Sequence, residues 1–273
     1  MQNIKLRKTT SELNAIRGPK GLIAYNTDDG SIRCYDGEVL GGWSFQGDLA
    51  IPQAPGPGPK YFVAGDEDLG YYGTLSDGEF FSSSALIEAT GYSEGSIVPA
   101  AADLTWLKFS RQGKVLYIPR CPIVRGAKWS TLYQNGMVYG TDDTGYDPFP
   151  VDTPVIQDSR VTYGNDTFIV RLPTGSSANP APDTLGGGEW NDLMYRVWNS
   201  DPNGDYWDTF TDEQLVPNPG SVSWCQESYG SDSRVSRGYS AGGNNVVSYW
   251  GATDPEFSNN SNYCWRPVLE LVE

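Results

Sequence analysis

The side chains of this sequence best suited to chemistry are carboxylates, because the 273-residue chain contains no histidine. Histidine is the usual general base, the usual partner of a nucleophile and the commonest metal ligand. Paired carboxyl groups can act instead, as in glycoside cleavage, where they face each other across a cleft at about 5–10 Å. Glu189 with Asp192 or Asp208 is such a pair, but 34 Asp and Glu residues make chance pairs plentiful. We expect no catalytic residue and keep a surface-glycan-degrading enzyme as the competing class.

An acidic stretch in the carboxyl half has the spacing of a calcium loop. Asp201, Asn203 and Asp205 place oxygen ligands at alternate positions, as calcium loops do. However, Tyr206 stands where such a loop has glycine, and the last ligand is Asp212 in place of glutamate. A solvated acidic loop is therefore the favoured interpretation, with calcium binding left open. We expect no metal site and no cofactor.

Aromatic side chains are frequent, at 13% of the residues, and some lie among Ser, Gly and Asn. Tyr and Trp in such surroundings are typical of an adaptable recognition surface. An alternative is that these rings belong to the core or to a subunit interface, and Trp265 is assigned to the core. The candidate ligand-binding residues are Trp224, Tyr229, Tyr239, Tyr249 and Trp250.

Charge and hydropathy exclude two classes of partner. The net charge of −15 disfavours nucleic acid, since affinity for phosphates depends on Lys and Arg. No apolar run is long enough to span a membrane, and no basic amphipathic stretch suggests a membrane surface. Residues 1–10 lack the apolar core of a signal peptide, which predicts assembly in a reducing cytoplasm. Free thiols are expected for the four cysteines, and a Cys225–Cys264 bridge is left open.

The amino-terminal half predicts short elements separated by turns. A helix is expected to begin at Thr10 or Ser11, and residues 21–37 read as a β-hairpin around an Asp-Asp-Gly turn. A lone hairpin is marginally stable, so it needs a partner, either another domain or copies of itself. Residues 51–60, rich in Pro and Gly, predict a semi-rigid linker, with a surface loop inside one domain as the alternative.

Further elements are expected along the rest of the chain. The patterns predict helices over 82–90, 128–136 and 190–197, a hairpin over 106–117, and strands over 168–174, 234–240 and 246–250. Tyr263 to Leu271 reads as a closing strand interrupted at Pro267, which pairs with a strand far upstream. The alternative is an edge strand of an ordinary sandwich.

Four short segments, taken in order, resemble the C-type lectin-like fold in the branch of formylglycine-generating enzymes. They are RLPT (171–174), EW (189–190), RVSRGYS (234–240) and WRP (265–267), and the resemblance covers residues 106–273. The chain departs from that branch by an insertion at 175–188 and by the absence of cysteine between Gly238 and Tyr263. Relatives with histidine-bound iron are excluded because the chain has no histidine. The enzymatic activity of that branch is therefore not expected.

Other segments resemble phage virion proteins. GLIAYNTDDGSIRCYDG (21–37), followed by Trp43, resembles a repeat near the attachment end of tail-fibre proteins. The segments WLKF...GK.LY (106–117), GEWN..M (188–194) and WRPVLEL (265–271) resemble virion proteins more broadly. The expected class is α+β and β-rich, with an N-terminal β-hairpin stem and a C-type lectin-like C-terminal domain.

The residue patterns and these resemblances together predict an organisation and a role. The lone hairpin and the Pro/Gly linker are the reason to expect an oligomer, because neither could bury enough apolar area by itself. Residues 1–50 would form a virion-attachment and oligomerisation stem, 51–60 a linker, 61–105 a collar or docking segment, and 106–273 the lectin-like domain. The chain would be a non-enzymatic virion surface protein, assembled in the host cytoplasm as a homotrimer, that attaches to a host-surface glycan or protein. Its stem would bind other virion proteins. A capsid decoration or head-fibre role is the alternative.

Overall fold

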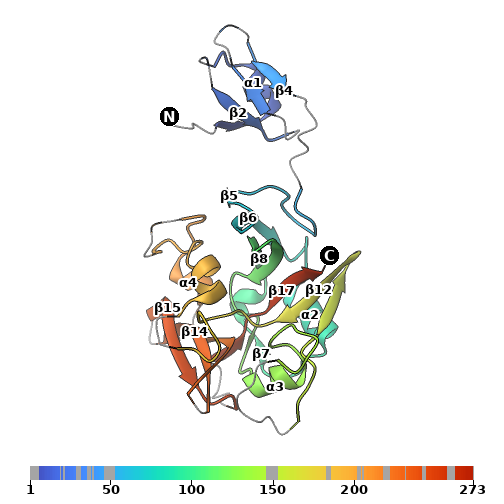
Figure 1. Ribbon diagram of the computed structural model, residues 1–273, viewed down its shortest axis with the longest axis vertical. Coiled ribbons are helices and arrows are strands. Elements are labelled where there is room, and N and C mark those ends of the chain that lie inside the picture. Colours follow the sequence, from blue (N-terminus) through green and yellow to red (C-terminus); the bar gives the residue numbers. More distant parts are fainter. Residues whose placement is uncertain are drawn as a thin grey trace. The chain divides into compact units, whose positions relative to one another are not determined.

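The computed structural model describes residues 6–18, 20, 22–28, 32–35, 38, 40–45, 53–145, 153–182, 186–201, 204, 206–217, 222–230, 232–241, 244–256 and 262–272. The chain divides into two compact units, unit 1 (Met1–Gln53) and unit 2 (Ala54–Glu273), and each is described by itself (Figure 1). The described residues form three sheets, which makes the chain α+β and β-rich as expected. No helix among them is long and apolar enough to cross a membrane.

Unit 1 contains the predicted hairpin, which is not alone. Its sheet has the order β1 (Leu6–Lys8), β2 (Ile23–Asn26), β3 (Ile32–Cys34), β4 (Trp43–Phe45). The hairpin is β2–β3, with Ile23 opposite Cys34, and it confirms the prediction. Residues 29–31 of its turn lie outside the described residues. Because β1 and β4 flank the hairpin, unit 1 itself supplies a partner, and the hairpin does not require other copies of the chain.

A short helix completes unit 1. The helix α1 (Thr10–Asn14) begins where the sequence predicts, and Thr9 and Glu12 form a capping box at its start. Leu13 from this helix packs with Ala24 and Tyr35 in a small buried cluster. The Tyr35 hydroxyl also donates a hydrogen bond to the Leu13 carbonyl oxygen at 3.1 Å. This cluster ties the helix to the sheet.

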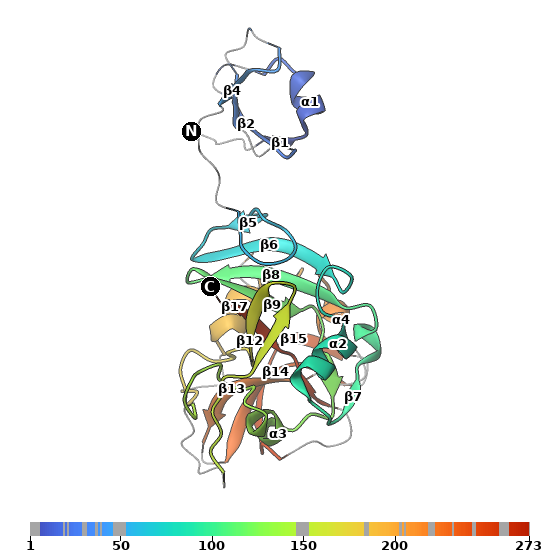
Figure 2. The ribbon, with the colours of Figure 1, turned by 90° about the vertical axis from the view of Figure 1, so that its right-hand side faces the viewer.

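Unit 2 is built around two larger sheets (Figure 2). The seven-stranded sheet has the order β11 (Arg160–Tyr163), β12 (Asp166–Arg171), β17 (Val268–Val272), β9 (Lys114–Pro119), β8 (Thr105–Arg111), β6 (Leu69–Ser76), β5 (Ala64–Gly65). The six-stranded sheet has the order β15 (Asn244–Thr253), β14 (Ser233–Ala241), β13 (Val222–Tyr229), β16 (Tyr263–Trp265), β10 (Val124–Arg125), β7 (Ser96–Ile97). The helical elements are α2 (Ser83–Thr90), η1 (Pro99–Ala101), α3 (Trp129–Gln134), the π-helical turn η2 (Trp190–Met194) and α4 (Asp212–Leu215).

The seven-stranded sheet is buried on both faces. Along β8 and β9, Trp106 and Tyr117 belong to one hydrophobic cluster, whereas Leu107 and Leu116 belong to a second. Successive side chains of a strand point to opposite faces, so the two clusters cover opposite sides. The β8–β9 hairpin turns at Gln112 and Gly113, both with positive φ, as a two-residue turn requires.

The predicted closing strand is confirmed, in two pieces. Its first part is β16 in the six-stranded sheet and its second is β17 in the seven-stranded sheet, with Arg266 and Pro267 between them. Proline has no backbone N–H to donate, which accounts for the break. Leu269 of β17 pairs with Val170 on one side and Tyr117 on the other, both far upstream. The strand is therefore interior to the seven-stranded sheet, and the alternative of an edge strand is wrong.

Two expected domain boundaries differ from the structure. Unit 2 begins at Ala54, inside the expected linker 51–60, and residues 54–60 pack on unit 2. Residues 61–105, expected as a separate collar, contribute β5, β6, α2, η1 and β7 to unit 2. The physical reason is direct pairing, since β6 runs antiparallel to β8 from Leu69 to Ser76. Residues 51 and 52 lie outside the described part of the chain.

Candidate functional site

One of the five predicted binding residues is a core residue. Trp224 on β13 has 0% of its surface exposed, and its ring stacks on Tyr263 with centroids 4.6 Å apart. Its indole N–H donates to the Ala127 carbonyl oxygen at 2.7 Å. The prediction that Trp224 binds a ligand is therefore wrong, because no face of the ring reaches solvent. Trp265 is fully buried, as predicted.

Two further predicted residues pack on each other beside the core. Tyr229 and Trp250 meet edge to face with ring centroids 5.0 Å apart. Both are partly buried against Ala181, Cys225 and Val235. Their rings are thus committed at least in part to packing within unit 2.

The remaining two, Tyr239 and Tyr249, form the pair that we call the tyrosine patch. They lie on neighbouring strands β14 and β15, with ring centroids 4.9 Å apart and 32° between the ring planes. Both rings are partly exposed, and neither belongs to a hydrophobic cluster of the described residues. A β-bulge between Arg237 and Tyr239 displaces the strand locally. Among the five predicted residues, these two are therefore the ones that no hydrophobic cluster of the described residues includes.

Gly251 gives the Tyr249 ring its position. A β-carbon at Gly251 would lie 2.6 Å from the Tyr249 hydroxyl oxygen and 2.8 Å from a ring carbon. The ring therefore lies against the backbone of β15, where only glycine leaves room. Tyr263 lies close to this group and is not among the predicted binding residues. Its pKa is raised by burial, and the nearby Tyr249 and Tyr239 add to the rise.

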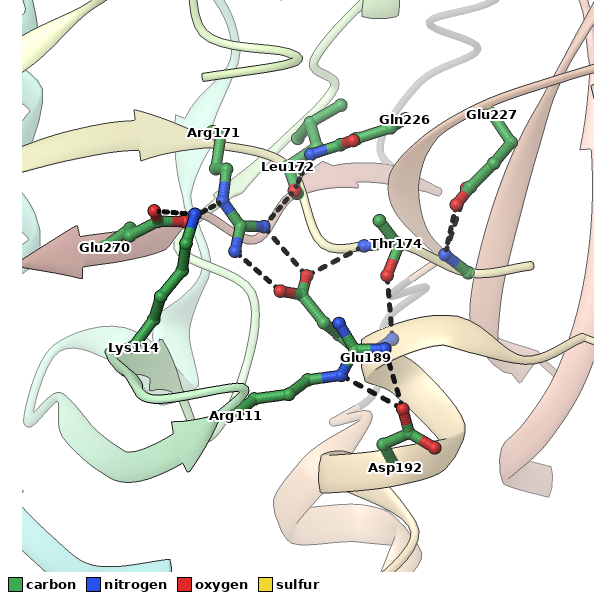
Figure 3. Close-up of polar contacts among 11 residues, drawn as sticks. Arg111, Lys114, Arg171, Leu172, Thr174, Glu189, Asp192, Gln226, Glu227 and Glu270 are labelled. Atoms are coloured by element: carbon green, nitrogen blue, oxygen red, sulfur yellow. Dashed lines mark hydrogen bonds and ion pairs between the residues drawn. The ribbon is translucent and has the colours of Figure 1, made fainter. Parts of the chain in front are cut away.

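Unit 2 contains a buried ion network of Arg171, Glu189 and Glu270, which the exposed Lys114 extends to the surface (Figure 3). Arg171 Nη1 and Nη2 donate to the two Glu189 carboxylate oxygens at 2.8 and 2.6 Å. Arg171 Nε donates to Glu270 Oε2 at 3.0 Å, and Lys114 Nζ donates to the other oxygen of Glu270 at 2.5 Å. The RLPT and EW segments thus meet in space although residues 175–188 separate them.

The carboxylates of the competing enzyme hypothesis, Glu189, Asp192 and Asp208, already have hydrogen-bond partners within the protein. Burial acts to raise the pKa of Glu189, but the Arg171 guanidinium and the Thr174 N–H outweigh it and hold the pKa below its usual range. Asp192 accepts from Arg111 at 2.8 and 3.0 Å, and Asp208 accepts from the Tyr71 hydroxyl at 2.8 Å. A general acid for glycoside cleavage needs a raised pKa and access to substrate. Glu189, at 2% exposure, has neither.

Glu227 is a buried acid that the sequence does not single out. It is 3% exposed, and both carboxylate oxygens accept from the Gly175 N–H, at 3.1 and 3.0 Å (Figure 3). Burial raises its pKa to about 7, against the opposing effect of the backbone N–H donors. The Gly175 carbonyl oxygen accepts from Arg237 at 2.8 Å, so Gly175 links the acid to the guanidinium.

Glu227 predicts an unusual dependence of stability on pH. Its folded pKa lies above its unfolded value, so the folded state binds more protons between about pH 4.5 and 7. This contribution to stability is present below that range and is lost as the pH rises through 7. Glu227→Gln should remove a decline on the order of 2–3 kcal/mol in unfolding free energy between pH 5 and 8. Urea denaturation at several pH values measures it, with exposed Glu88→Gln as control; an unchanged slope contradicts the assignment.

The acidic stretch 201–212 is used for internal contacts where it is described. Asp212 accepts from the Val247 N–H at 2.9 Å, and Asp208 from Tyr71. Asn203 and Asp205 lie outside the described residues. Among the residues whose positions are given, no group of three or more His, Cys, Asp or Glu side chains could hold a metal ion.

The cysteines are thiols. None of the four, all of which lie in the described part of the chain, is joined in a disulfide. Cys225 and Cys264 are buried, and burial raises the pKa of both thiols. The alternative of a Cys225–Cys264 bridge is therefore excluded in this structure.

No protein-family model, no curated protein and no solved structure matches this chain. The candidate site therefore stands on its own geometry. That geometry selects Tyr239 and Tyr249 as a candidate recognition surface.

Proposed function

We propose that the chain is a non-enzymatic phage virion surface protein. In this proposal unit 2 is a C-type lectin-like head for attachment to a host surface, and unit 1 is the stem that binds other virion proteins. A homotrimer, assembled in the host cytoplasm, is the proposed form on the particle. The support from sequence is the set of ordered segments from RLPT to WRPVLEL and the tail-fibre-like segment 21–37.

The observation that carries the proposal is the position of β17. This strand pairs with β12 and β9 and so joins the two halves of the seven-stranded sheet. In this proposal the head gives rigid support to the tyrosine patch, because β17 directly follows β16, which belongs to the same six-stranded sheet as β14 and β15. Rigid support matters because a binding surface that is already ordered loses less entropy when the ligand arrives.

Binding through the tyrosine patch predicts a separable phenotype. Tyr249→Ala or Tyr239→Ala should weaken adsorption by about 2 kcal/mol, roughly thirtyfold, as for an aromatic anchor at an interface. The unfolding free energy should change by less than about 1 kcal/mol, since both rings are partly exposed. Adsorption assays and thermal melts on the same preparations measure the two effects.

Tyr206→Ala is the matched control, because Tyr206 is 52% exposed and lies outside the β14–β15 pair. It should leave adsorption unchanged. Trp250→Ala is the second comparison, and a loss of stability there would assign that ring to packing. If Tyr239→Ala and Tyr249→Ala both adsorb normally, the recognition surface lies elsewhere.

The alternative role on the particle is a capsid decoration or head fibre. Electron microscopy of particles labelled through unit 2 separates the two, since label over the whole capsid would contradict a tail-fibre position. The competing enzyme class is tested by assaying the purified protein against host polysaccharide. Sustained depolymerisation that one carboxylate substitution abolishes would overturn the non-enzymatic proposal.

A further inference from the structure

Residues 54–60 form a closed loop at the start of unit 2. The Ala54 N–H donates to the Lys60 carbonyl oxygen at 2.9 Å, which brings the two ends together. Between them prolines at 55, 57 and 59 alternate with Gly56 and Gly58, whose φ values are 74° and 76°. Proline fixes φ near −65°, so the sign of φ alternates from residue to residue between Pro55 and Pro59. No ladder among the described strands includes this loop.

The loop surrounds one cation. Lys108 Nζ donates to the carbonyl oxygens of Pro55, Pro57 and Pro59 at 2.9, 3.1 and 2.8 Å. An ammonium has three N–H donors, so all of them are used. Lys108 is 0% exposed although it carries the charge of a surface residue. The alternating backbone thus aims three acceptors at one buried ammonium.

Two aromatic rings complete the enclosure. Nζ lies 5.2 Å from the Tyr72 ring centroid and 5.6 Å from that of Tyr117, within the range of cation–π attraction. The Tyr117 hydroxyl also donates to the Pro57 carbonyl oxygen at 2.9 Å. Burial lowers the pKa of Lys108 to about 7, Lys60 adds to the lowering, and Asp166 opposes it. Holding a charge here is costly, and the carbonyl oxygens and ring faces offset that cost.

The loop fits closely against the sheet. A β-carbon at Gly56 would lie 2.5 Å from the Tyr117 hydroxyl oxygen, and one at Gly58 would lie 2.8 Å from a Leu75 methyl group. Both glycines also have positive φ, which other residues adopt only with strain. The fit therefore depends on the glycines as well as on the lysine.

We propose that residues 54–60 are a clasp, a loop closed on the Lys108 ammonium that fixes where the chain enters unit 2 and opens as a whole when the cation is withdrawn. Opening breaks no strand pairing. It would add the length of these residues, roughly 25 Å when extended, to the chain between the two units. The clasp is a property of unit 2 and does not depend on the display function.

Trypsin cleavage after Lys60 in the full chain tests the clasp. In the closed loop the Lys60 amine donates to the Gly56 carbonyl oxygen at 2.5 Å, and cleavage should be slow. In Lys108→Met, cleavage after Lys60 should be about tenfold faster or more, because proteolysis follows the population of the open form. Cleavage elsewhere in unit 2 should keep its rate. Lys114→Met, a change at an exposed lysine on neighbouring β9, is the matched control: it removes one trypsin site and the Glu270 contact but should leave the rate of cleavage after Lys60 unchanged.

Chemical rescue tests the role of the charge. Lys108→Ala removes the atoms of propylammonium, so adding propylammonium should restore slow cleavage at Lys60, and 1-propanol should not. Gly58→Ala keeps the lysine but places a β-carbon against Leu75, so the loop can no longer pack closely on the sheet. This variant should also be cleaved faster after Lys60 and at an unchanged rate elsewhere in unit 2. Wild-type protection at Lys60 in both Lys108→Met and Gly58→Ala would overturn the proposal. So would cleavage at every site of unit 2 in both variants, since the loop would then be an inseparable part of the fold.

Discussion

Replacing Glu189 with glutamine should lower the unfolding free energy of unit 2 by about 3–5 kcal/mol, the cost of stranding a buried charge. The Arg171 guanidinium would lose two charge-assisted hydrogen bonds and keep only Glu270 as an anionic partner. Glutamine keeps only one acceptor oxygen, so it cannot accept from Arg171 Nη1, Arg171 Nη2 and the Thr174 N–H together, and its NH2 group would face one of these donors. Chemical denaturation at neutral pH measures the loss.

The neighbouring ion pair provides the control. Asp192 accepts from Arg111 in a similar geometry, but 41% of its side chain is exposed. Asp192→Asn should therefore cost only about 0–1 kcal/mol. A double change of Arg171→Met with Glu189→Met should cost less than the sum of the single changes, because no unpaired charge then remains at that pair. A loss below about 1 kcal/mol in Glu189→Gln would mean that the network contributes little.

Trp224→Ala should be the most destabilising change among the five residues predicted to bind a ligand. The indole fills a fully buried site and stacks on Tyr263, so truncation should cost about 3–5 kcal/mol through the cavity left behind. The Ala127 carbonyl oxygen would lose its donor as well. Thermal and urea denaturation measure the effect, and any loss of adsorption should follow the loss of folded protein.

Trp224→Phe separates the two contributions, since it keeps an aromatic ring and removes the indole N–H. It should be milder than alanine and should leave adsorption intact where the protein is folded. Tyr249→Ala, in the same sheet, should show the opposite pattern, with weaker adsorption and little change in stability. Comparing the two variants therefore separates a packing role from a recognition role. Weak adsorption by a fully stable Trp224 variant would restore this residue to the binding surface.

Local sequence patterns predicted elements well where the signal is local. The β8–β9 hairpin turns at Gln112-Gly113, α1 begins beside its capping box, and β17 follows the proline that interrupts the closing run. Each of these depends on a few neighbouring residues whose backbone preferences are strong. Turn geometry, capping and the missing proline donor are properties of the segment itself.

The predictions that were wrong concern features that depend on contacts between residues far apart in the sequence. Trp224 and Tyr249 both lie among Ser, Gly and Asn, yet Trp224 is buried because β13 also pairs with β16. The Pro/Gly composition of 51–60 predicts a linker, and contacts with residues far along the chain, among them Lys108 and Tyr117, make residues 54–60 part of unit 2. The sequence did identify Tyr239 and Tyr249, but only among five candidate binding residues. Selecting among those candidates required the pairing of the strands.

The order of strands in the seven-stranded sheet also constrains how the protein is made. The β11–β12 pair and the β9–β8–β6–β5 group are bridged by β17, whose residues are translated after all of theirs. During synthesis these two groups of strands cannot pair through β17 until residue 272 has left the ribosome. Until then the edges of β12 and β9 that β17 will occupy remain unpaired by it. Unit 1, by contrast, draws its described strands from residues before 46 and can complete its sheet while the rest is being translated. The incomplete unit 2 is thus the stage of synthesis at which chaperones would be needed most.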